Sequence, residues 1–133
     1  MNVGMNRLGN FSALSSKLSY RRAELLVAFA TMLVTFDLML KMEGLYIYVT
    51  EYYRSSKRQR ELYDRGLTLT LKSKHILGLA FDIAIIDKNG KFLKEDDTKM
   101  YGILGSWWES HGGVWGGRWK IGDGHDVYHF QHN

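Results

Sequence analysis

The strongest constraint on the fold is a run of eight residues, 79–86, that is apolar except for Asp82. A short apolar run rich in β-branched residues predicts a strand buried in a sheet. An unpaired carboxylate in such a strand is costly, because protein replaces water as its solvent. Asp82 therefore needs a partner, and either an ordinary salt bridge or a metal ion meets that need.

Two histidines are candidate partners for this carboxylate. His75 precedes the strand, and His129 lies in a second apolar strand predicted at residues 128–131. If the two strands pair, Asp82 and His129 come together, and His75 completes a set of nitrogen and oxygen ligands. A catalytic zinc site uses three such ligands and leaves one position for water. A single histidine is more often structural than a ligand, so the prediction depends on the pairing of the strands.

Hydrolytic chemistry also requires a base beside the water. Asp126 is the candidate because it precedes the second strand by a short turn, while Asp123 and His125 are rivals for this role or for a ligand role. Arg54 is either a surface helix residue or a group that binds a substrate carboxylate or steadies an oxyanion. Trp115 and Trp119, on either side of two glycines, are either core residues or the wall of a substrate groove.

The remaining pattern predicts an α+β fold, a small antiparallel sheet backed by helices in a single domain. The 133 residues divide into an N-terminal helical part, about 12–42, and a core of about 45–131. The Asn89-Gly90 pair favours a type I′ hairpin between two strands. Helices are predicted at about 16–42, 56–64 and 98–110, and strands at 45–51, 79–86, 91–93 and 128–131.

Composition narrows the possible functions. Cysteine is absent, which excludes disulfides and thiolate metal sites, so any zinc here is bound by histidine and carboxylate. The net charge of +4 suits a polyanionic surface, such as a cell wall or a nucleic acid, and selects neither. The basic residues between 54 and 60 read as a solvated helix face, so no nucleic-acid partner is expected.

An apolar segment at residues 25–36 raises the question of a membrane helix or a signal peptide. It is shorter than the roughly 20 residues that a spanning helix needs. Arg21 and Arg22 precede it as in a signal peptide, but no small-x-small cleavage site follows. We therefore expect a buried core helix, no stable membrane insertion and no clear signal peptide.

Three separated motifs and a fourth block resemble one known family, the VanY-like zinc peptidases. This family includes D-alanyl-D-alanine carboxypeptidases and phage L-alanyl-D-glutamate endopeptidases. The blocks are Ser73-x-His75-x-x-Gly78-x-Ala80-x-Asp82, Trp115-Gly116-Gly117-x-Trp119, Asp126-x-x-His129-Phe130, and Thr50-Glu51-Tyr52-Tyr53-Arg54-Ser55 with Gln59.

The resemblance implies a fold of the Hedgehog and D-Ala-D-Ala-peptidase type and a role for each matching residue. One zinc ion would be bound by His75, Asp82 and His129, and Asp126 would be the general base. Arg54 would bind or polarise substrate, with Ser73 and Trp115 as further substrate-binding candidates. The chain departs from the family pattern at Val127, where proline is usual, and at Gln131, where glutamate is usual.

The function that this resemblance implies is a peptidoglycan hydrolase similar to phage endolysins, which cuts the L-alanyl-D-glutamate bond of stem peptides. One alternative is a D,D- or L,D-carboxypeptidase that releases terminal D-Ala. Another is a non-catalytic, zinc-containing module that binds the cell wall. We expect a bacteriolytic monomer that stays in the host cytoplasm until lysis and then acts on the cell wall or periplasm.

Overall fold

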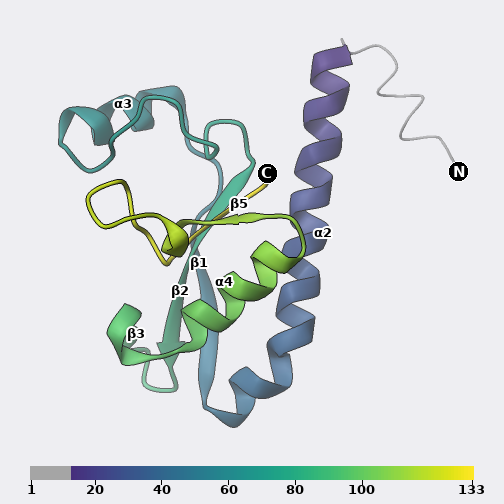
Figure 1. The fold of residues 1–133 in the computed structure, drawn as a ribbon, viewed down its shortest axis with the longest axis vertical. Coiled ribbons are helices and arrows are strands. Elements are labelled where there is room, and N and C mark those ends of the chain that lie inside the picture. Colours follow the sequence, from purple (N-terminus) through teal and green to yellow (C-terminus); the bar gives the residue numbers. More distant parts are fainter. Residues whose placement is uncertain (1–12) are drawn as a thin grey trace, which may run out of the picture.

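A computed structural model describes residues 13–133 of the protein, so the predicted start of the helical part near residue 12 lies outside the described residues. Figure 1 shows a long helix standing beside a twisted sheet, with a second helix packed across the sheet. The elements are α2 (Ala13–Met42), β1 (Leu45–Glu51), α3 (Ser56–Asp64), β2 (Ala80–Asp87), β3 (Phe92–Leu93), η1 (Glu95–Asp97), α4 (Met100–Ser110), β4 (Val114–Trp115), η2 (Gly116–Arg118) and β5 (His129–Gln131).

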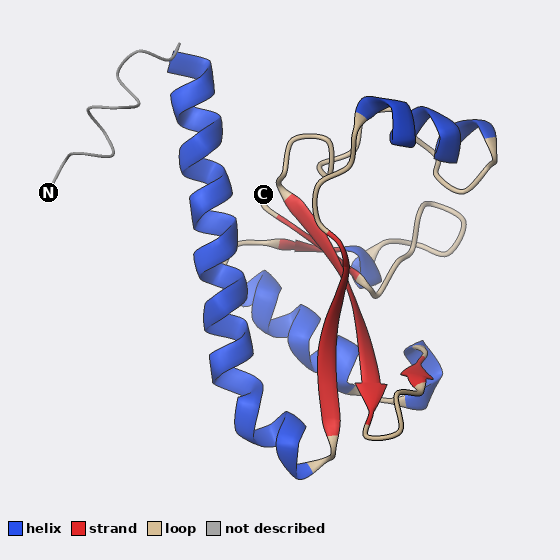
Figure 2. Cartoon of the chain, turned by 180° about the vertical axis from the view of Figure 1, so that it is seen from behind, coloured by secondary structure: helices blue, strands red, loops and turns tan. Residues whose placement is uncertain are grey.

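The sheet is antiparallel, and β2 is its central strand. Its order is β1-β2-β5-β4, with β3 also paired to β2. Figure 2 shows the long β1 and β2 strands from behind. The pairing of β2 with β5 places Asp82 directly opposite His129. The predicted α+β class with a small antiparallel sheet is confirmed, and so is the strand pairing on which the predicted site depends.

Aromatic packing fixes the sheet against both long helices. The Phe81 ring lies 4.2 Å from that of Phe29 on α2 and 5.2 Å from that of Trp108 on α4, measured between ring centroids. Phe81 also stacks on Phe130 of β5, with centroids 5.4 Å apart. Because side chains alternate along a strand, Phe81 faces this core while its neighbour Asp82 faces the opposite side.

The helix α2 differs from its predicted burial. Leu25 and Met32 are 1% and 0% exposed, but Val34 is 77% and Leu38 70% exposed. The segment Lys17–Met42 is long and apolar enough to cross a membrane by length and composition, and 17% of an 18-residue apolar stretch within it is buried. The prediction of a buried core helix therefore holds for one face only, because the sheet and α4 cover a single side of the cylinder.

The hairpin after β2 also differs from prediction. A type I′ turn requires a positive φ at both central residues. Among the described residues, positive φ angles occur only at glycines, so Asn89 does not meet this requirement. Instead, the Asp87 carboxylate accepts hydrogen bonds from the backbone N–H groups of Asn89 and Lys91, at 2.8 and 2.9 Å. Gly90, at φ 78°, supplies the one left-handed residue that the turn needs.

Candidate active site

The structure brings together the three predicted metal ligands. Asp82 comes from β2, His129 from β5, and His75 from the turn before β2. His75 Nε2 lies 3.1 Å and His129 Nδ1 3.0 Å from the same carboxylate oxygen, Asp82 Oδ1. One ligand atom from each residue lies within 4.8 Å of the others. Gly78, at φ 67°, reverses the chain after His75 and lets the turn lead directly into β2.

Each imidazole is also held from its outer side. His75 Nδ1 donates a hydrogen bond to the backbone carbonyl of Tyr52 at 2.8 Å. His129 Nε2 lies 2.8 Å from the side-chain oxygen of Gln131. Such outer contacts fix the orientation and tautomer of a metal-binding histidine. They leave His75 Nε2 and His129 Nδ1 directed toward Asp82.

The electrostatics favour an ionised carboxylate in this cluster. Burial raises the pKa of Asp82, but hydrogen bonds from His129 and His75 outweigh burial and lower the pKa to about 2. Burial likewise opposes a charge on His129, and the hydrogen bond to Asp82 reverses that effect and raises its pKa. Two imidazole nitrogens and one carboxylate oxygen form a donor set that zinc accepts. The residues present therefore fit the metal that the sequence predicts.

Asp126 lies beside this cluster but is not one of the three grouped ligands. Burial raises the pKa of its carboxyl group, and the charge on Asp82 raises it further. Its Oδ1 accepts a hydrogen bond from the Tyr128 backbone at 3.0 Å. A Cβ atom at Gly116 would lie 2.4 Å from the Asp126 carbonyl oxygen, so the loop requires glycine there. This environment suits a carboxylate that takes up a proton.

Arg54 is buried, and side chains of the protein occupy its donors. Its guanidinium donates to both carboxylate oxygens of Glu51 and, from Nη1 at 2.8 Å, to Gln59. Arg54 Nη2 also lies 3.9 Å from Asp82 Oδ2. The hydrogen bond to Glu51 raises the pKa of Arg54 and lowers that of Glu51. In this arrangement Arg54 steadies Asp82, and a substrate contact would require it to exchange partners.

The other predicted site residues fall on different sides of the sheet. Ser73 lines the groove, and its hydroxyl accepts a hydrogen bond from the His75 backbone at 3.2 Å. Trp115 is buried, donates from its indole to the Val127 carbonyl at 2.9 Å and does not line the groove. Trp119 lines the groove instead, with its ring 5.3 Å from that of His129. Of the two tryptophans that flank the glycines, Trp119 is therefore the groove wall and Trp115 the core residue. Glu51 is a site residue that sequence reasoning missed, although it stands inside a recognised motif block.

The two rival candidates near Asp126 are placed differently from it. His125 pairs with Glu95 at 2.9 Å and with the Trp119 carbonyl at 2.8 Å, so its ring ties the loop to η1. Asp123 is exposed at the groove rim. Neither belongs to the group of possible metal ligands among the described residues.

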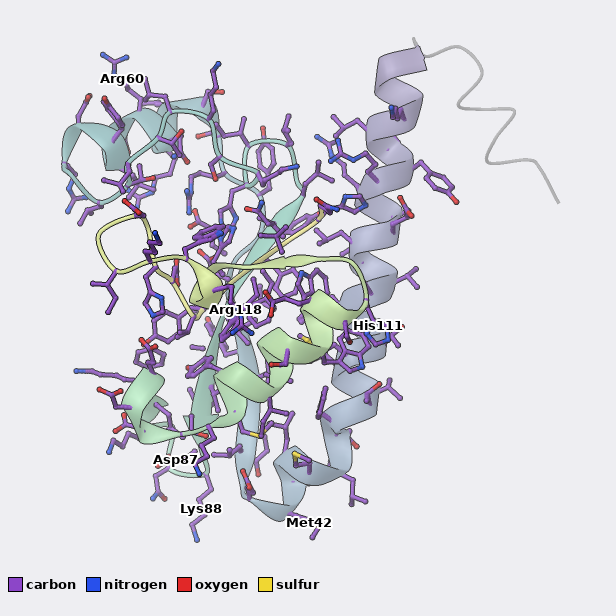
Figure 3. The ribbon with its side chains drawn as sticks, in the orientation of Figure 1. Met42, Arg60, Asp87, Lys88, His111 and Arg118 are labelled. Atoms are coloured by element: carbon purple, nitrogen blue, oxygen red, sulfur yellow. The ribbon has the colours of Figure 1, made fainter. Side chains whose placement is uncertain are left out.

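The cluster opens into a groove of about 820 Å³. Basic side chains from residues 54–74 and acidic side chains from both walls line it. The predicted solvated face of α3 is present, because Arg58 and Arg60 form exposed pairs with Glu61 and Asp64. Figure 3 shows Arg60 projecting from α3 away from the rest of the molecule. Of this basic segment, Arg54 and Arg58 line the groove, and Arg54 alone is buried.

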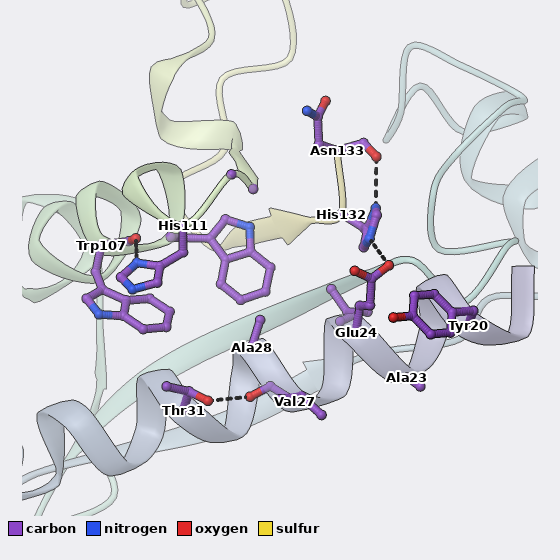
Figure 4. Close-up of a pocket in the computed structure, with 14 residues that line it drawn as sticks. Tyr20, Ala23, Glu24, Val27, Ala28, Thr31, Trp107, His111, His132 and Asn133 are labelled. Carbon is purple, nitrogen blue, oxygen red and sulfur yellow. Dashed lines mark hydrogen bonds and ion pairs between the residues drawn. The ribbon is translucent and has the colours of Figure 1, made fainter. Parts of the chain in front are cut away.

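A second concavity, of about 500 Å³, lies between α2 and the end of α4. It is mainly apolar, and Figure 4 shows Trp107 and His111 on one side and Glu24 with His132 on the other. None of the three grouped ligands lines it. The three grouped ligands therefore line the groove over the sheet and not this concavity.

Comparison with known proteins places this fold and site in the class of peptidases. A family model described as D-alanyl-D-alanine carboxypeptidase matches residues 68–132, which contain all three ligands and Asp126. The solved L-Ala D-Glu endopeptidase ChiX of Serratia marcescens is 30% identical, with a TM-score of 0.53; the match covers 67% of this chain and 68% of that protein. The chain belongs to the VanY-like D-alanyl-D-alanine carboxypeptidase family, as its sequence motifs predict.

Proposed function

We propose that this protein is a zinc-dependent peptidoglycan peptidase that cuts the L-alanyl-D-glutamate bond of stem peptides. The observation that carries the proposal is the convergence of His75, Asp82 and His129 beside Asp126 at the base of one groove. The activity named for the solved relative supports the choice of bond. Like a phage endolysin, the protein would act on the cell wall once it reaches it.

In this proposal the residues of the site have separate roles. His75 through Nε2, His129 through Nδ1 and the Asp82 carboxylate would hold zinc, which when bound acidifies a water molecule and polarises a carbonyl. Asp126 accepts a proton at its carboxylate and returns it to the leaving amine; its raised pKa makes it a better base than an ordinary aspartate. Arg54 keeps Asp82 in place through charge.

The groove suits an anionic peptide. Lys72 and Lys74 line the wall next to Ser73. No salt bridge to either lysine is formed by the described residues. Stem peptides carry free carboxylates, which such cations attract.

Digestion of defined muropeptides with the zinc-loaded protein, followed by mass spectrometry, tests the proposal. We expect separation of L-Ala from a peptide that begins with D-Glu, and loss of this product after chelation. Release of free D-Ala would instead establish the carboxypeptidase that the matched family model names. Binding to cell walls without any product, at full zinc occupancy, would establish a non-catalytic module.

The matched control is Asp126→Ala. Because Asp126 is outside the group of ligands, this variant should retain zinc and lose turnover. Normal turnover of the variant would exclude Asp126 as the base.

A further inference from the structure

The loop that follows η2 carries two groups of the groove. Trp119 begins the loop and lines the groove, and Asp126, the proposed base, lies at its far end. The residues between 120 and 124 are all exposed, and Gly122 and Gly124 have positive φ angles of 92° and 89°. An exposed segment of this kind has few packing contacts of its own. The positions of Trp119 and Asp126 therefore depend on a small number of specific contacts.

One side chain closes this loop and connects it to a second element. His125 Nδ1 lies 2.8 Å from the backbone carbonyl oxygen of Trp119. His125 Nε2 lies 2.9 and 3.2 Å from the two carboxylate oxygens of Glu95 in η1. Glu95 is itself fixed, because its backbone N–H donates a hydrogen bond to the Tyr128 hydroxyl at 3.2 Å. The His125 ring thus joins the start of the loop, its end and η1.

Both partners of the His125 ring are hydrogen-bond acceptors. A backbone carbonyl and an ionised carboxylate donate no hydrogen bond, and a neutral imidazole has a single N–H. Only the imidazolium, which has an N–H on each nitrogen, satisfies both contacts at once. The charged groups that act on the ring are Glu95 from η1 and Asp126 from its own loop. The hydrogen bonds to Glu95 and to the Trp119 carbonyl, with these charges, raise the pKa of His125.

We propose that His125, as an imidazolium, is a positioning residue that holds Asp126 beside the metal ligands and Trp119 at the groove wall. This inference rests on the proposed role of Asp126 as the base. His125 is not one of the three grouped ligands, so it acts through its neighbours in the loop. Its two contacts are complete below the pKa of His125. One of them is lost as the pH rises through that pKa, because the neutral ring donates to a single acceptor.

Nuclear magnetic resonance of the metal-free protein tests this inference without any activity measurement. Titration of the ¹⁵N-labelled His125 ring gives its pKa. Hydrogen exchange of the Asp126 amide, which donates to the Gly116 carbonyl at 3.0 Å, reports how firmly the end of the loop is held. In Glu95→Gln the pKa of His125 should fall, because a neutral amide replaces the carboxylate. At a pH between the two pKa values, the Asp126 amide should then exchange about two- to fivefold faster, as expected for loss of an exposed ion pair.

The matched control is Asp96→Asn, which removes the neighbouring exposed carboxylate of η1. This variant should keep both the wild-type pKa of His125 and the wild-type exchange of Asp126. An equal His125 pKa in the wild-type protein and in Glu95→Gln would overturn the proposal. Equal exchange of the Asp126 amide in these two proteins would overturn it as well.

Turnover of muropeptides by the zinc-loaded protein gives a second readout. His125→Arg keeps donors at every pH, because a guanidinium stays charged. Wild-type turnover should therefore fall relative to that of His125→Arg as the pH rises through the pKa of His125, with thermal unfolding as the check that the variant is folded. A ratio that does not change with pH would refute the positioning role. Absence of any product from the wild-type protein would instead refute the proposed function, and the exchange comparison would still decide the role of His125.

Discussion

Asp82 and Asp126 are two carboxylates in one groove, and their environments shift their pKa values in opposite directions. Hydrogen bonds from two imidazoles outweigh burial at Asp82 and bring its pKa to about 2, whereas burial and the nearby Asp82 charge raise the pKa of Asp126. Opposite shifts of neighbouring acids are a common sign of divided roles. The permanently ionised group suits a metal ligand, and the more basic one suits proton transfer.

The raised pKa of Asp126 has a measurable effect on stability. The folded protein holds this group in its charged form less readily than the unfolded chain does, so ionisation destabilises the fold as the pH rises above the ordinary value of 3.8. Asp126→Asn, which keeps the acceptor for the Tyr128 backbone, should therefore unfold at higher urea than wild type at pH 7 and lose turnover.

Urea unfolding of the metal-free proteins at pH 7 and near pH 3 checks this expectation. The stabilisation should disappear at the lower pH, where wild-type Asp126 is protonated in both states. Asp123→Asn, at an exposed position of the same loop, is the matched control. A variant less stable than wild type at pH 7 would contradict the burial argument.

At the residue scale, the sequence indicated which side chains form the site better than it indicated which partners those side chains contact. The residues allowed a cluster of His75, Asp82 and His129 if the two strands paired, and the family resemblance implied it; the pairing of Asp82 with His129 is present. Arg54 was predicted to face substrate, and it is held by Glu51 and Gln59. A guanidinium can donate to several nearby acceptors. Which of them it binds depends on side-chain geometry, which the spacing in the sequence does not specify.

At the scale of elements, α4 and the β4–η2 segment are joined through one indole. A Cβ atom would lie 2.1 Å from the Trp115 ring at both Gly105 on α4 and Gly117 on η2. The indole thus occupies the volume that two missing side chains leave. This contact holds the strand that pairs with β5, and so supports His129.

Substitutions at two glycines of the same helix test this contact. Alanine is favoured over glycine in a helix by about 1 kcal/mol, and a Cβ at Gly102 meets nothing within 4 Å. Gly102→Ala should therefore raise the midpoint of thermal unfolding. Gly105→Ala should lower it despite the same helical gain, because overpacking costs about 1–3 kcal/mol or more. Equal midpoints for the two variants would contradict the packing described.

Helices and strands whose own residues favour that structure were predicted well, and those that depend on distant parts of the chain were not. The strand at 45–51 has β-branched and aromatic residues throughout, and β1 spans Leu45–Glu51. The two-residue strand β4 was not predicted, because its only cause is pairing with β5 across the chain. The Asn89-Gly90 turn took a different form because the Asp87 side chain competes for its backbone donors.

At the scale of the molecule, α2 acts as a support for the sheet. Its hydropathy predicted a helix, but apolar residues surround the helix on every side, so no pattern indicated which face the sheet would cover. Met32 is fully buried, while Val34, two residues along, is 77% exposed. The inward face carries the packing energy, and nothing in the described structure covers the outward face.

Alanine substitutions on the inward and outward faces of α2 should show how much each face contributes to the free energy of unfolding. Met32→Ala should lower the free energy of unfolding by about 2–5 kcal/mol, since it leaves a cavity in the core. Val34→Ala should change it by less than about 0.5 kcal/mol. Urea unfolding of both variants gives the comparison, and a large loss at Val34 would show that the outward face is covered in solution.

The hydrogen bonds within the His75–Asp82–His129 cluster affect the stability of the protein without a bound metal ion. Among the described residues, no buried side-chain nitrogen or oxygen lacks a hydrogen-bond partner. We therefore expect the fold to persist without an ion, unlike that of a zinc finger, which unfolds without its metal. Under the proposed zinc dependence, scarcity of metal would then leave an intact but inactive molecule that becomes active when metal is supplied.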